Sequence, residues 1–234
     1  MNKELQPIQD IKIAVDAVVF GYNRENLLIL LVQQKFGPYK DQWVLPGGFV
    51  LNGESLNQAV NRELQEEAGI KVDYLEQLYT FGDEVGRDPR GQVISIAYLA
   101  LVNPQKLYLK ADTDAQDAQW FPIKNFPSLG FDHTQIIEKG LQRLKAKLQY
   151  QPIGFDLLEE EFPFSDLENL YQVILGRPLD RRNFRKKMLS FDILTETNKI
   201  RKVGSGRPAK LFRFNREKYK EKEQTGFHFE IKYA

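Results

Sequence analysis

The chain has 234 residues, enough for one large domain or two smaller ones with a hydrophobic core and no disulfide staples. It contains no cysteine, which excludes disulfides and thiolate metal sites and fits a reducing environment. No apolar run reaches the length of a membrane-spanning helix, and the first ten residues lack the apolar core of a signal peptide. We therefore expect a cytoplasmic protein with no membrane segment.

Strands and helices alternate in the first half of the chain. Apolar and β-branched runs predict strands at residues 11–20, 27–32, 42–45, 72–79, 93–102 and 118–122. A helix is expected to open at Ser55 and end at Gly69, and another at residues 134–148, where apolar residues recur with helical spacing. The polar, glycine-containing stretch 82–92 lies between two of the strands and is placed to cover a ligand.

Three glutamates on the helix after Ser55 point to a metal site. Glu63, Glu66 and Glu67 stand at i, i+3 and i+4, so they lie on roughly one face of the helix. Like charges at this spacing repel one another and raise carboxylate pKa values. A hard divalent cation, Mg²⁺ or Mn²⁺, would relieve the repulsion, because such ions prefer oxygen ligands and share their coordination with substrate phosphates.

The stretch that begins at Gly48 resembles the Nudix box, with every specified position filled: Gly48, Glu54, Arg62, Glu63, Leu64, Glu66, Glu67, Gly69 and Ile70. The resemblance implies an α/β/α sandwich and metal-assisted attack of water on a diphosphate linked to a nucleoside or similar group. It also implies that Glu63, Glu66 and Glu67 hold the metal, that Arg62 orients a glutamate and that Glu54 supports the loop or the metal shell. The alternative is a solvated acidic helix face.

A second segment suggests the ligand. Arg87 and Arg90, followed by the strand with Ser95 and Tyr98, resemble a segment of Nudix proteins that handle ADP-ribose. With Gly48 in the adjoining loop, these two arginines would bind the ligand, since a guanidinium matches phosphate oxygens bidentately. The alternative is an exposed, charged hairpin loop without a ligand.

Other polar residues of the first half leave several roles open. We expect Asp132 to cap the last helix and His133 to be a satisfied structural histidine rather than a catalytic base. Four more carboxylates outside the box are candidate metal ligands or bases, although a solvated loop carboxylate is the favoured interpretation of each: Asp83, Glu84, Asp114 and Asp117.

The chain changes character after residue 150. Pro152 and Gly154 break the helical pattern, which predicts a linker at residues 149–154 and domains at 1–150 and 151–234. Residues 177–220 carry 15 Lys or Arg against four Asp or Glu, in a protein whose net charge is only +1. Such a basic block suggests a polyanionic partner, most often double-stranded DNA.

The pattern of the basic block predicts a winged helix-turn-helix. A capping box from Ser165 to Glu168 would open a first helix that ends at Gly176, and Asp180 would cap a second. Strands at 193–197 and 211–214 flank a basic loop suited to a wing on the phosphate backbone. The expected DNA contacts are Arg181, Arg182, Arg185 and Lys186 on the second helix and Lys202, Arg207 and Lys210 on the wing. The alternative is a solvated basic face on a helical appendage.

This second half resembles the winged-helix domain of the Nudix-related transcriptional regulators of the NrtR family. The matching stretches are FDLL at 155–158, LYQVILGRPLDRRNFRKKM at 170–188 and GRPAKLFRF at 206–214. The resemblance implies an α+β protein whose Nudix domain senses ADP-ribose or a related metabolite and whose homodimer binds a palindromic operator, in many members at genes of NAD metabolism. Some relatives answer to sugars such as arabinose.

Three hypotheses follow from the whole sequence. The favoured one is a ligand-responsive transcriptional regulator. The complete box keeps a second open, a Mg²⁺-dependent ADP-ribose or nucleoside-diphosphate pyrophosphatase with a C-terminal appendage. The third is a sugar-responsive regulator in which the box is only structural. The segment 227–233 alternates weakly and is expected to be a tail or an edge strand.

Overall fold

A mixed sheet forms the first half of the protein. The computed structural model describes residues 10–111, 115–202 and 208–234. The sheet order is β3-β2-β1-β6-β5, with β4 also paired to β1 and β7 to β2. In the middle, β1 runs parallel to β6 and antiparallel to β2. The strands are β1 (Lys12–Tyr22), β2 (Leu27–Gln34), β3 (Trp43–Val44), β4 (Gly47–Phe49), β5 (Tyr74–Phe81), β6 (Val93–Leu101) and β7 (Ala115–Pro122).

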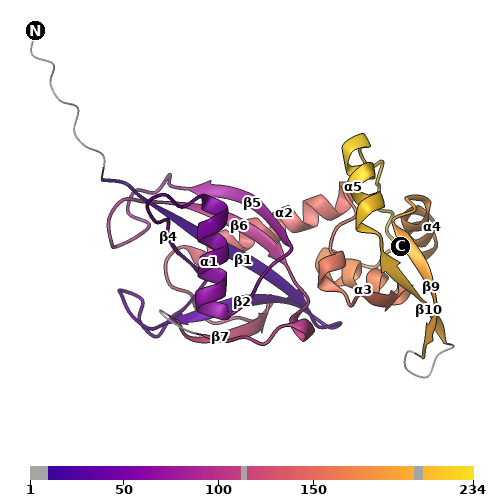
Figure 1. Cartoon of the computed structure of the whole chain (residues 1–234), viewed down its shortest axis with the longest axis horizontal. Helices are drawn as coiled ribbons and strands as arrows, with labels where there is room; N and C mark the ends of the chain where they lie inside the picture. Colours follow the sequence, from indigo (N-terminus) through magenta and orange to yellow (C-terminus); the bar gives the residue numbers. More distant parts are fainter. Residues whose placement is uncertain (1–9, 112–114, 203–207) are drawn as a thin grey trace, which may run out of the picture.

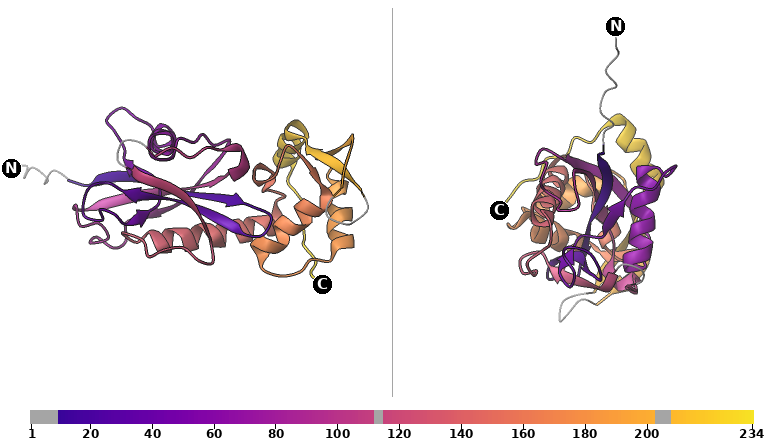
Figure 2. Two further views of the ribbon diagram at one scale, coloured as in Figure 1. Left: turned by 90° about the horizontal axis from the view of Figure 1, so that it is seen from below. Right: turned by 90° about the vertical axis from the view of Figure 1, so that its left-hand side faces the viewer.

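Two helices, α1 (Leu56–Ala68) and α2 (His133–Tyr150), cover opposite faces of this sheet, as Figures 1 and 2 show. Along β1, Val15 and Val19 belong to the apolar cluster under α1, whereas Val18 and Phe20 belong to the cluster under α2. This alternation follows from the two-residue period of a strand buried on both faces. The expected α/β/α sandwich is confirmed, with β4 as an additional strand.

The second half is a winged helix. Three antiparallel strands, in the order β8-β10-β9, pack with two helices. Figure 1 shows β9 and β10 beside α3 and α4. The elements are β8 (Glu161–Pro163), α3 (Phe164–Leu175), α4 (Arg181–Ser190), β9 (Leu194–Arg201) and β10 (Ala209–Phe214). The two helices and two strands expected from the sequence are confirmed, and β8 is a third strand that the sequence analysis missed.

The capping box expected at Ser165 is wrong. Helix α3 begins at Phe164, its N-cap residue is Pro163, and no side chain caps it. The reason is that β8 feeds the chain directly into the helix, where the Phe164 ring is buried in the core. Burial of an aromatic side chain stabilises the helix start more than a single capping hydrogen bond would.

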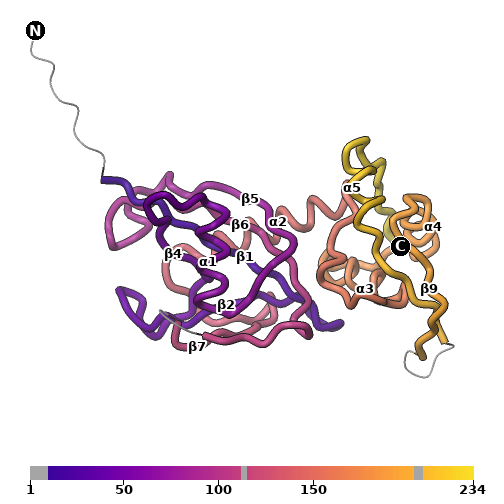
Figure 3. The backbone as a smooth tube through the Cα atoms, viewed as in Figure 1, coloured from indigo at the N-terminus to yellow at the C-terminus, as the bar shows by residue number. Residues whose placement is uncertain are grey.

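The segment expected to be a linker is packed rather than loose. Helix α2 continues to Tyr150, and the chain from Pro152 to Phe155 is buried before the 3₁₀ turn η2 (Phe155–Leu157). The Tyr171 hydroxyl donates a hydrogen bond to the Ile153 carbonyl at 3.0 Å. Figure 3 shows the backbone passing from α2 into α3 between the two halves of the molecule. The domain division at residue 150 stays a prediction.

The C-terminal segment is neither a bare tail nor an edge strand. Residues Arg216–Thr225 form α5, which the sequence analysis missed, and the Asn215 side chain caps it by accepting from the Lys218 amide. After Gly226 the chain is extended, and Phe229 and Ile231 are buried in the winged-helix core. Within the described residues, this last stretch pairs with a neighbour only through an isolated bridge between Tyr233 and Leu179.

Candidate functional site

Helix α1 has the limits that the sequence predicts. The Ser55 hydroxyl accepts from the Gln58 amide while the Gln58 side chain accepts from the Ser55 amide, which forms a capping box. At the other end Gly69 adopts a left-handed conformation with φ 70°, which glycine tolerates without strain. These two ends fix which face of the helix carries the glutamates.

Arg62 is the centre of the glutamate cluster. Its guanidinium donates to both carboxylate oxygens of Glu54, at 2.8 and 3.0 Å, to Glu63 at 2.8 Å and to Glu66 at 3.1 Å. It also donates to the Phe49 carbonyl at 3.1 Å, which ties the helix to β4. The hydrogen bonds from Arg62, followed by one from the Leu51 amide, lower the pKa of Glu54. Arg62 thus holds Glu54 before the helix together with Glu63 and Glu66 on it.

The glycine loop lies directly against two buried glutamates. The Gly47 amide donates to Glu67 at 2.9 Å. At Gly48 a Cβ atom would lie 2.2 Å from Oε1 of Glu63, so only glycine lets the loop approach this closely. The side chains of Glu63 and Glu67 are therefore confined between the helix and the loop.

The donor set suits a divalent cation that completes its coordination with other ligands. Glu63 and Glu67 are only 9% and 6% exposed, and their oxygens are the ligand type that Mg²⁺ and Mn²⁺ prefer. Across the described ranges, no three acidic or histidine side chains are grouped to hold one ion, and Glu66 is half exposed beside Arg62. Because Mg²⁺ usually takes only one or two protein carboxylates, together with waters and phosphates, this pair is sufficient.

Both ligand-binding arginines expected from the sequence have acidic partners inside the protein. Arg87 donates to the two oxygens of Asp132 at 2.8 and 2.5 Å, and Arg90 binds Asp88 at 2.7 Å. Arg87, Asp88 and Arg90 line a small cavity of about 30 Å³ beside Gly47 and Gly48. Asp132 is the N-cap residue of α2, but its side chain makes no capping bond because Arg87 binds it, so the expected cap is wrong in its detail.

His133 is a satisfied structural histidine, as expected. It is buried, and its Nδ1 accepts from the Leu45 amide at 2.8 Å, so Nε2 carries the proton of the neutral ring. Nε2 faces Asp16 at 3.5 Å, and Asp16 also accepts from the Ser95 hydroxyl. Burial lowers the pKa of His133, and this effect exceeds the opposing charges of Asp16 and Asp132. The ring anchors the chain just before the glycine loop.

Among the described residues, the other acidic candidates are not grouped with the glutamates of α1 into a metal site. Asp117 accepts from the Ala118 amide at 2.8 Å and from the Gln119 side chain at 2.5 Å. Asp83 and Glu84 lie on the exposed loop between β5 and β6. Asp114 lies outside the described residues.

Helix α4 presents a basic outer face. The Asp180 side chain accepts from the Asn183 amide and caps the helix as predicted, and Phe184 and Met188 are buried on its inner face. Arg182 and Lys186 are exposed on the outer face. Arg181 instead binds the buried Glu168 at 2.8 Å, although its side chain stays 70% exposed.

Some of the basic side chains of the wing are already paired with acidic residues of the protein. Lys202 is exposed, Lys210 binds Glu196 at 2.6 Å, and Arg207 lies outside the described residues. The acidic run before α3 neutralises part of the basic block, which the sequence analysis did not foresee. Its ion pairs are Glu159 with Arg201, Glu160 with Arg213, and Glu161 with Lys199 and Arg213.

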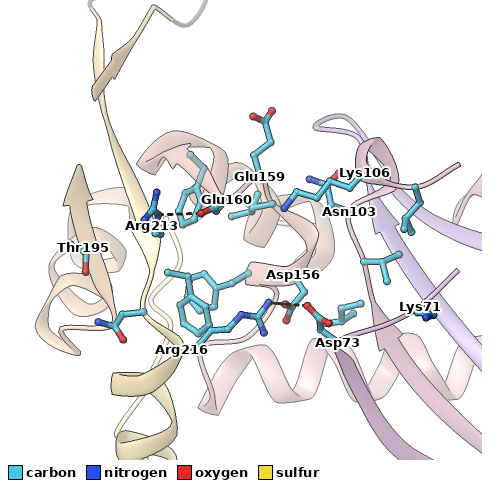
Figure 4. A pocket seen from close by; sticks show the side chains of 18 of the residues that line it. Lys71, Asp73, Asn103, Lys106, Asp156, Glu159, Glu160, Thr195, Arg213 and Arg216 are labelled. Carbon is cyan, nitrogen blue, oxygen red and sulfur yellow. Dashed lines mark hydrogen bonds and ion pairs between the residues drawn. The ribbon is translucent and has the colours of Figure 1, made fainter. Parts of the chain in front are cut away.

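The two halves face each other across a cleft of about 830 Å³ (Figure 4). On one side, Arg216 at the start of α5 points toward Asp156 and Asp73, at 2.6 and 3.5 Å. Lys71, which follows α1, also lines this cleft. The chain therefore reaches this cleft three residues after the end of α1 at Ala68.

The β1–β2 hairpin also touches the second half. Arg24 binds Glu159 at 3.1 Å and Asp166 at 3.3 Å. The Asn169 side chain on α3 donates to the Tyr22 hydroxyl at 2.6 Å and to the Arg24 carbonyl at 2.5 Å. Burial, only partly offset by the bond from Asn169, raises the pKa of Tyr22 to about 12. We call these five residues the hairpin contact.

Comparison with known proteins decides the family. The NUDIX domain family matches residues 10–141, and the NrtR DNA-binding winged helix domain matches residues 154–214. An ADPR responsive transcriptional repressor of Acinetobacter baylyi is 34% identical over 209 residues, covering 88% of this chain and 82% of that protein. The chain belongs to the NrtR family.

Solved structures of the family agree with this fold. NrtR of Shewanella oneidensis in complex with a 27mer DNA matches with a TM-score of 0.78 and 34% identity, covering 89% of this chain and 95% of that one. The NUDIX domain of the same NrtR, in complex with ADP ribose, matches with a TM-score of 0.55 and 34% identity, covering 62% of this chain and 99% of that one.

An enzyme also resembles the Nudix part of this NrtR-family chain. An ADP-ribose pyrophosphatase of Methanocaldococcus jannaschii is 43% identical over 128 residues, covering 54% of this chain and 70% of that protein. None of the helices in the described part of the chain has the length and apolar character needed to span a bilayer.

Proposed function

We propose that this protein is a transcriptional regulator that binds ADP-ribose or a related metabolite in its Nudix half and operator DNA through its winged helix. The proposal rests on one combination of features. The same chain has a complete Nudix box and a winged helix in which Arg182 and Lys186 are exposed on the outer face of α4. The Shewanella oneidensis structures, solved in complex with DNA and with ADP ribose, support both halves of the proposal.

On DNA, α4 would lie in the major groove and the wing along the phosphate backbone. Arg182 and Lys186 project away from the buried face of α4, and Lys202 extends the basic surface at the wing. The Arg185 guanidinium lies 4.4 Å from the centre of the Phe164 ring and 5.5 Å from that of Phe212, so it packs against α3 and β10. A homodimer would place two such helices on the halves of a palindromic operator.

In the Nudix half, Glu63 and Glu67 would hold Mg²⁺ or Mn²⁺ together with the diphosphate of the ligand. The bound ion would neutralise the diphosphate and act as a Lewis acid toward it. Arg62 keeps Glu54 and Glu63 in place, and the Gly47 amide fixes Glu67, so the protein's own residues set the position of both carboxylates. Arg87 and Arg90 line the adjacent cavity and would contact phosphate oxygens.

Regulation requires that the ligand bind one arrangement of the two halves better than another. The hairpin contact and the Arg216 ion pairs hold the arrangement seen here, and both lie on the edges of the cleft. Ion pairs of this exposure contribute on the order of 1 kcal/mol or less each, so a difference of about fivefold in ligand affinity between the two arrangements offsets one such pair.

Selection of bound sequences from a random duplex pool tests the proposal, run with and without ADP-ribose plus Mg²⁺. We expect a palindrome to be enriched and its enrichment to change when ADP-ribose is added. A palindrome that is indifferent to ADP-ribose would redirect the search for an effector to sugars. Binding at moderate salt that shows no preference for any duplex over random DNA would refute the regulator.

The intact box and the Methanocaldococcus relative favour a second candidate, hydrolysis of ADP-ribose to AMP and ribose 5-phosphate. The assay is Mg²⁺-dependent release of AMP, compared between the natural protein and Glu67→Gln. The amide keeps the size of Glu67 but removes its charge, so turnover should collapse in the variant. Absence of turnover on ADP-ribose and other nucleoside diphosphates would count against this activity.

A further inference from the structure

Phe131 has an unusual backbone at the edge of the small Nudix cavity. Its φ is +54°, in the left-handed region that a bulky side chain rarely occupies. Its ring packs on Tyr39 at 4.3 Å and is stacked on the buried His133 at 5.0 Å. Strained residues of this kind gather at ligand sites, where the surrounding structure holds them. The fold thus keeps the ring of Phe131 at the cavity despite a backbone cost.

Arg90 covers two aromatic rings at the same place. Its guanidinium lies 4.5 Å from the centre of the Phe49 ring and 4.9 Å from that of Phe131. Phe49 belongs to β4, directly after the glycine loop that contacts Glu63 and Glu67. A planar cation over two rings fills the position that a planar heteroaromatic ring would take, because both use the same faces.

The present position of Arg90 leaves little room for a ligand. The cavity beneath it holds only about 30 Å³, whereas pockets for small molecules are about ten times larger or more. Gln34 lines this cavity, and its buried Oε1 has no hydrogen-bond partner among the described residues. A ligand must therefore displace something, and Arg90, about one third exposed, is the most accessible side chain over the cavity.

Asp88 keeps one hydrogen bond when the Arg90 side chain moves away. Asp88 is only 5% exposed, yet it also accepts from the Arg90 backbone amide at 2.8 Å, a bond that remains when the side chain swings away. Arg87 lines the same cavity and keeps a positive charge nearby. The released guanidinium would lie within reach of the glycine loop, where the ligand's phosphates are expected.

We propose that Phe49 and Phe131 form a slot for the nucleobase of the ligand, that Arg90 fills the slot in the free protein, and that the base displaces Arg90 toward the diphosphate. This inference rests on the proposed function, because it specifies how the same Nudix half recognises an adenine nucleotide. Because stacking on the aromatic rings requires a base, the slot would bind nucleoside diphosphates in preference to diphosphates that lack a base.

Calorimetry and NMR on the full chain test the slot, without added divalent ion so that no ligand is hydrolysed. In the natural protein the adenine H2 and H8 signals of bound ADP-ribose should shift upfield, as stacking on aromatic faces requires. Phe49→Leu should weaken ADP-ribose about tenfold, the size of one lost base–aromatic stack, and leave inorganic pyrophosphate binding unchanged. Phe36→Leu is the matched control, since Phe36 is 61% exposed and does not line the cavity.

Arg90→Ala gives a second signature that loss of folding cannot imitate. The variant should bind adenosine more tightly than the natural protein does, because the slot is already empty, and ADP-ribose more weakly relative to adenosine. ADP-ribose that binds normally without an upfield shift, or that binds Phe49→Leu as well as Phe36→Leu, would overturn the slot alone. If the natural protein binds no ADP-ribose, the proposed effector fails and the slot fails with it.

Discussion

Replacing Gly48 by alanine tests whether Glu63 is part of the metal site. The new Cβ would lie 2.2 Å from Oε1 and 2.7 Å from Cδ of Glu63, so the carboxylate must retreat by about 1 Å to reach an ordinary contact distance. The retreat weakens the 2.8 Å hydrogen bond from Arg62, which keeps its bonds to Glu54. The cost to stability should be about 1 kcal/mol, since Arg62 is partly exposed.

A loss of this size lowers the unfolding temperature by about 2–4 °C in a protein of this length. The effect on metal binding should be far larger, because moving a group at a metal site typically costs 10- to 100-fold in metal affinity. The assay is calorimetric titration of Mg²⁺ in the presence of ADP-ribose, alongside thermal unfolding. Gly86→Ala is the control, because a Cβ at Gly86 meets open space. Unchanged Mg²⁺ affinity in Gly48→Ala would show that Glu63 is not a metal ligand.

Three further predictions concern the contacts between and within the halves. Arg24→Ala removes its ion pairs with α3 and the acidic run, and should reduce the ratio of operator affinities measured with and without ADP-ribose at least threefold. The control Lys218→Ala removes an ion pair internal to the winged helix, and an equal ratio in both variants would contradict this coupling. Arg182→Ala should lower the slope of log affinity against log salt by about 1 for any duplex, and an unchanged slope would exclude a phosphate contact. For Glu76, burial raises the pKa, but hydrogen bonds led by that from Lys147 outweigh it and lower the pKa below 4.5. The stabilisation is therefore present above pH 4.5 and lost as pH falls through the folded pKa. In Glu76→Gln, the free energy of unfolding measured with urea should fall less steeply between pH 4.5 and lower pH than in the natural protein. An equally steep fall in both proteins would refute this role of Glu76.

The parts of the site that could be predicted from sequence are those that depend on local spacing. Ser55 and Gly69 delimit α1 because capping and the left-handed turn are properties of a few adjacent residues. The grouping of Glu63 and Glu67 beside Gly48 follows from helix geometry and a tight loop. The pattern of buried and exposed positions on α4 followed from the same helical periodicity.

The parts that could not be predicted depend on partners distant in the chain. Arg87 meets Asp132, 45 residues away at the N-cap of α2. Arg90 meets the Phe49 ring, 41 residues away, because β6, which follows Arg90, and β4 both pair with β1. No local sequence pattern distinguishes an arginine that is free to bind phosphate from one that is already paired with a carboxylate. The same limit explains Arg181, whose position in the basic helix did not reveal that the buried Glu168 binds it.

Helix α2 connects the ligand cavity to the DNA-binding half in a way that neither half shows alone. At its start, Asp132 holds Arg87 and His133 anchors the chain before the glycine loop. Just past its end, Gln151 donates to the hydroxyl of Tyr219 on α5 at 2.6 Å. A ligand phosphate bound to Arg87 would compete with Asp132, the N-cap residue of a continuous 18-residue helix. Because a packed helix moves as a rigid body rather than deforming along its length, a shift at Asp132 must be met by a matching shift where α2 meets the winged helix.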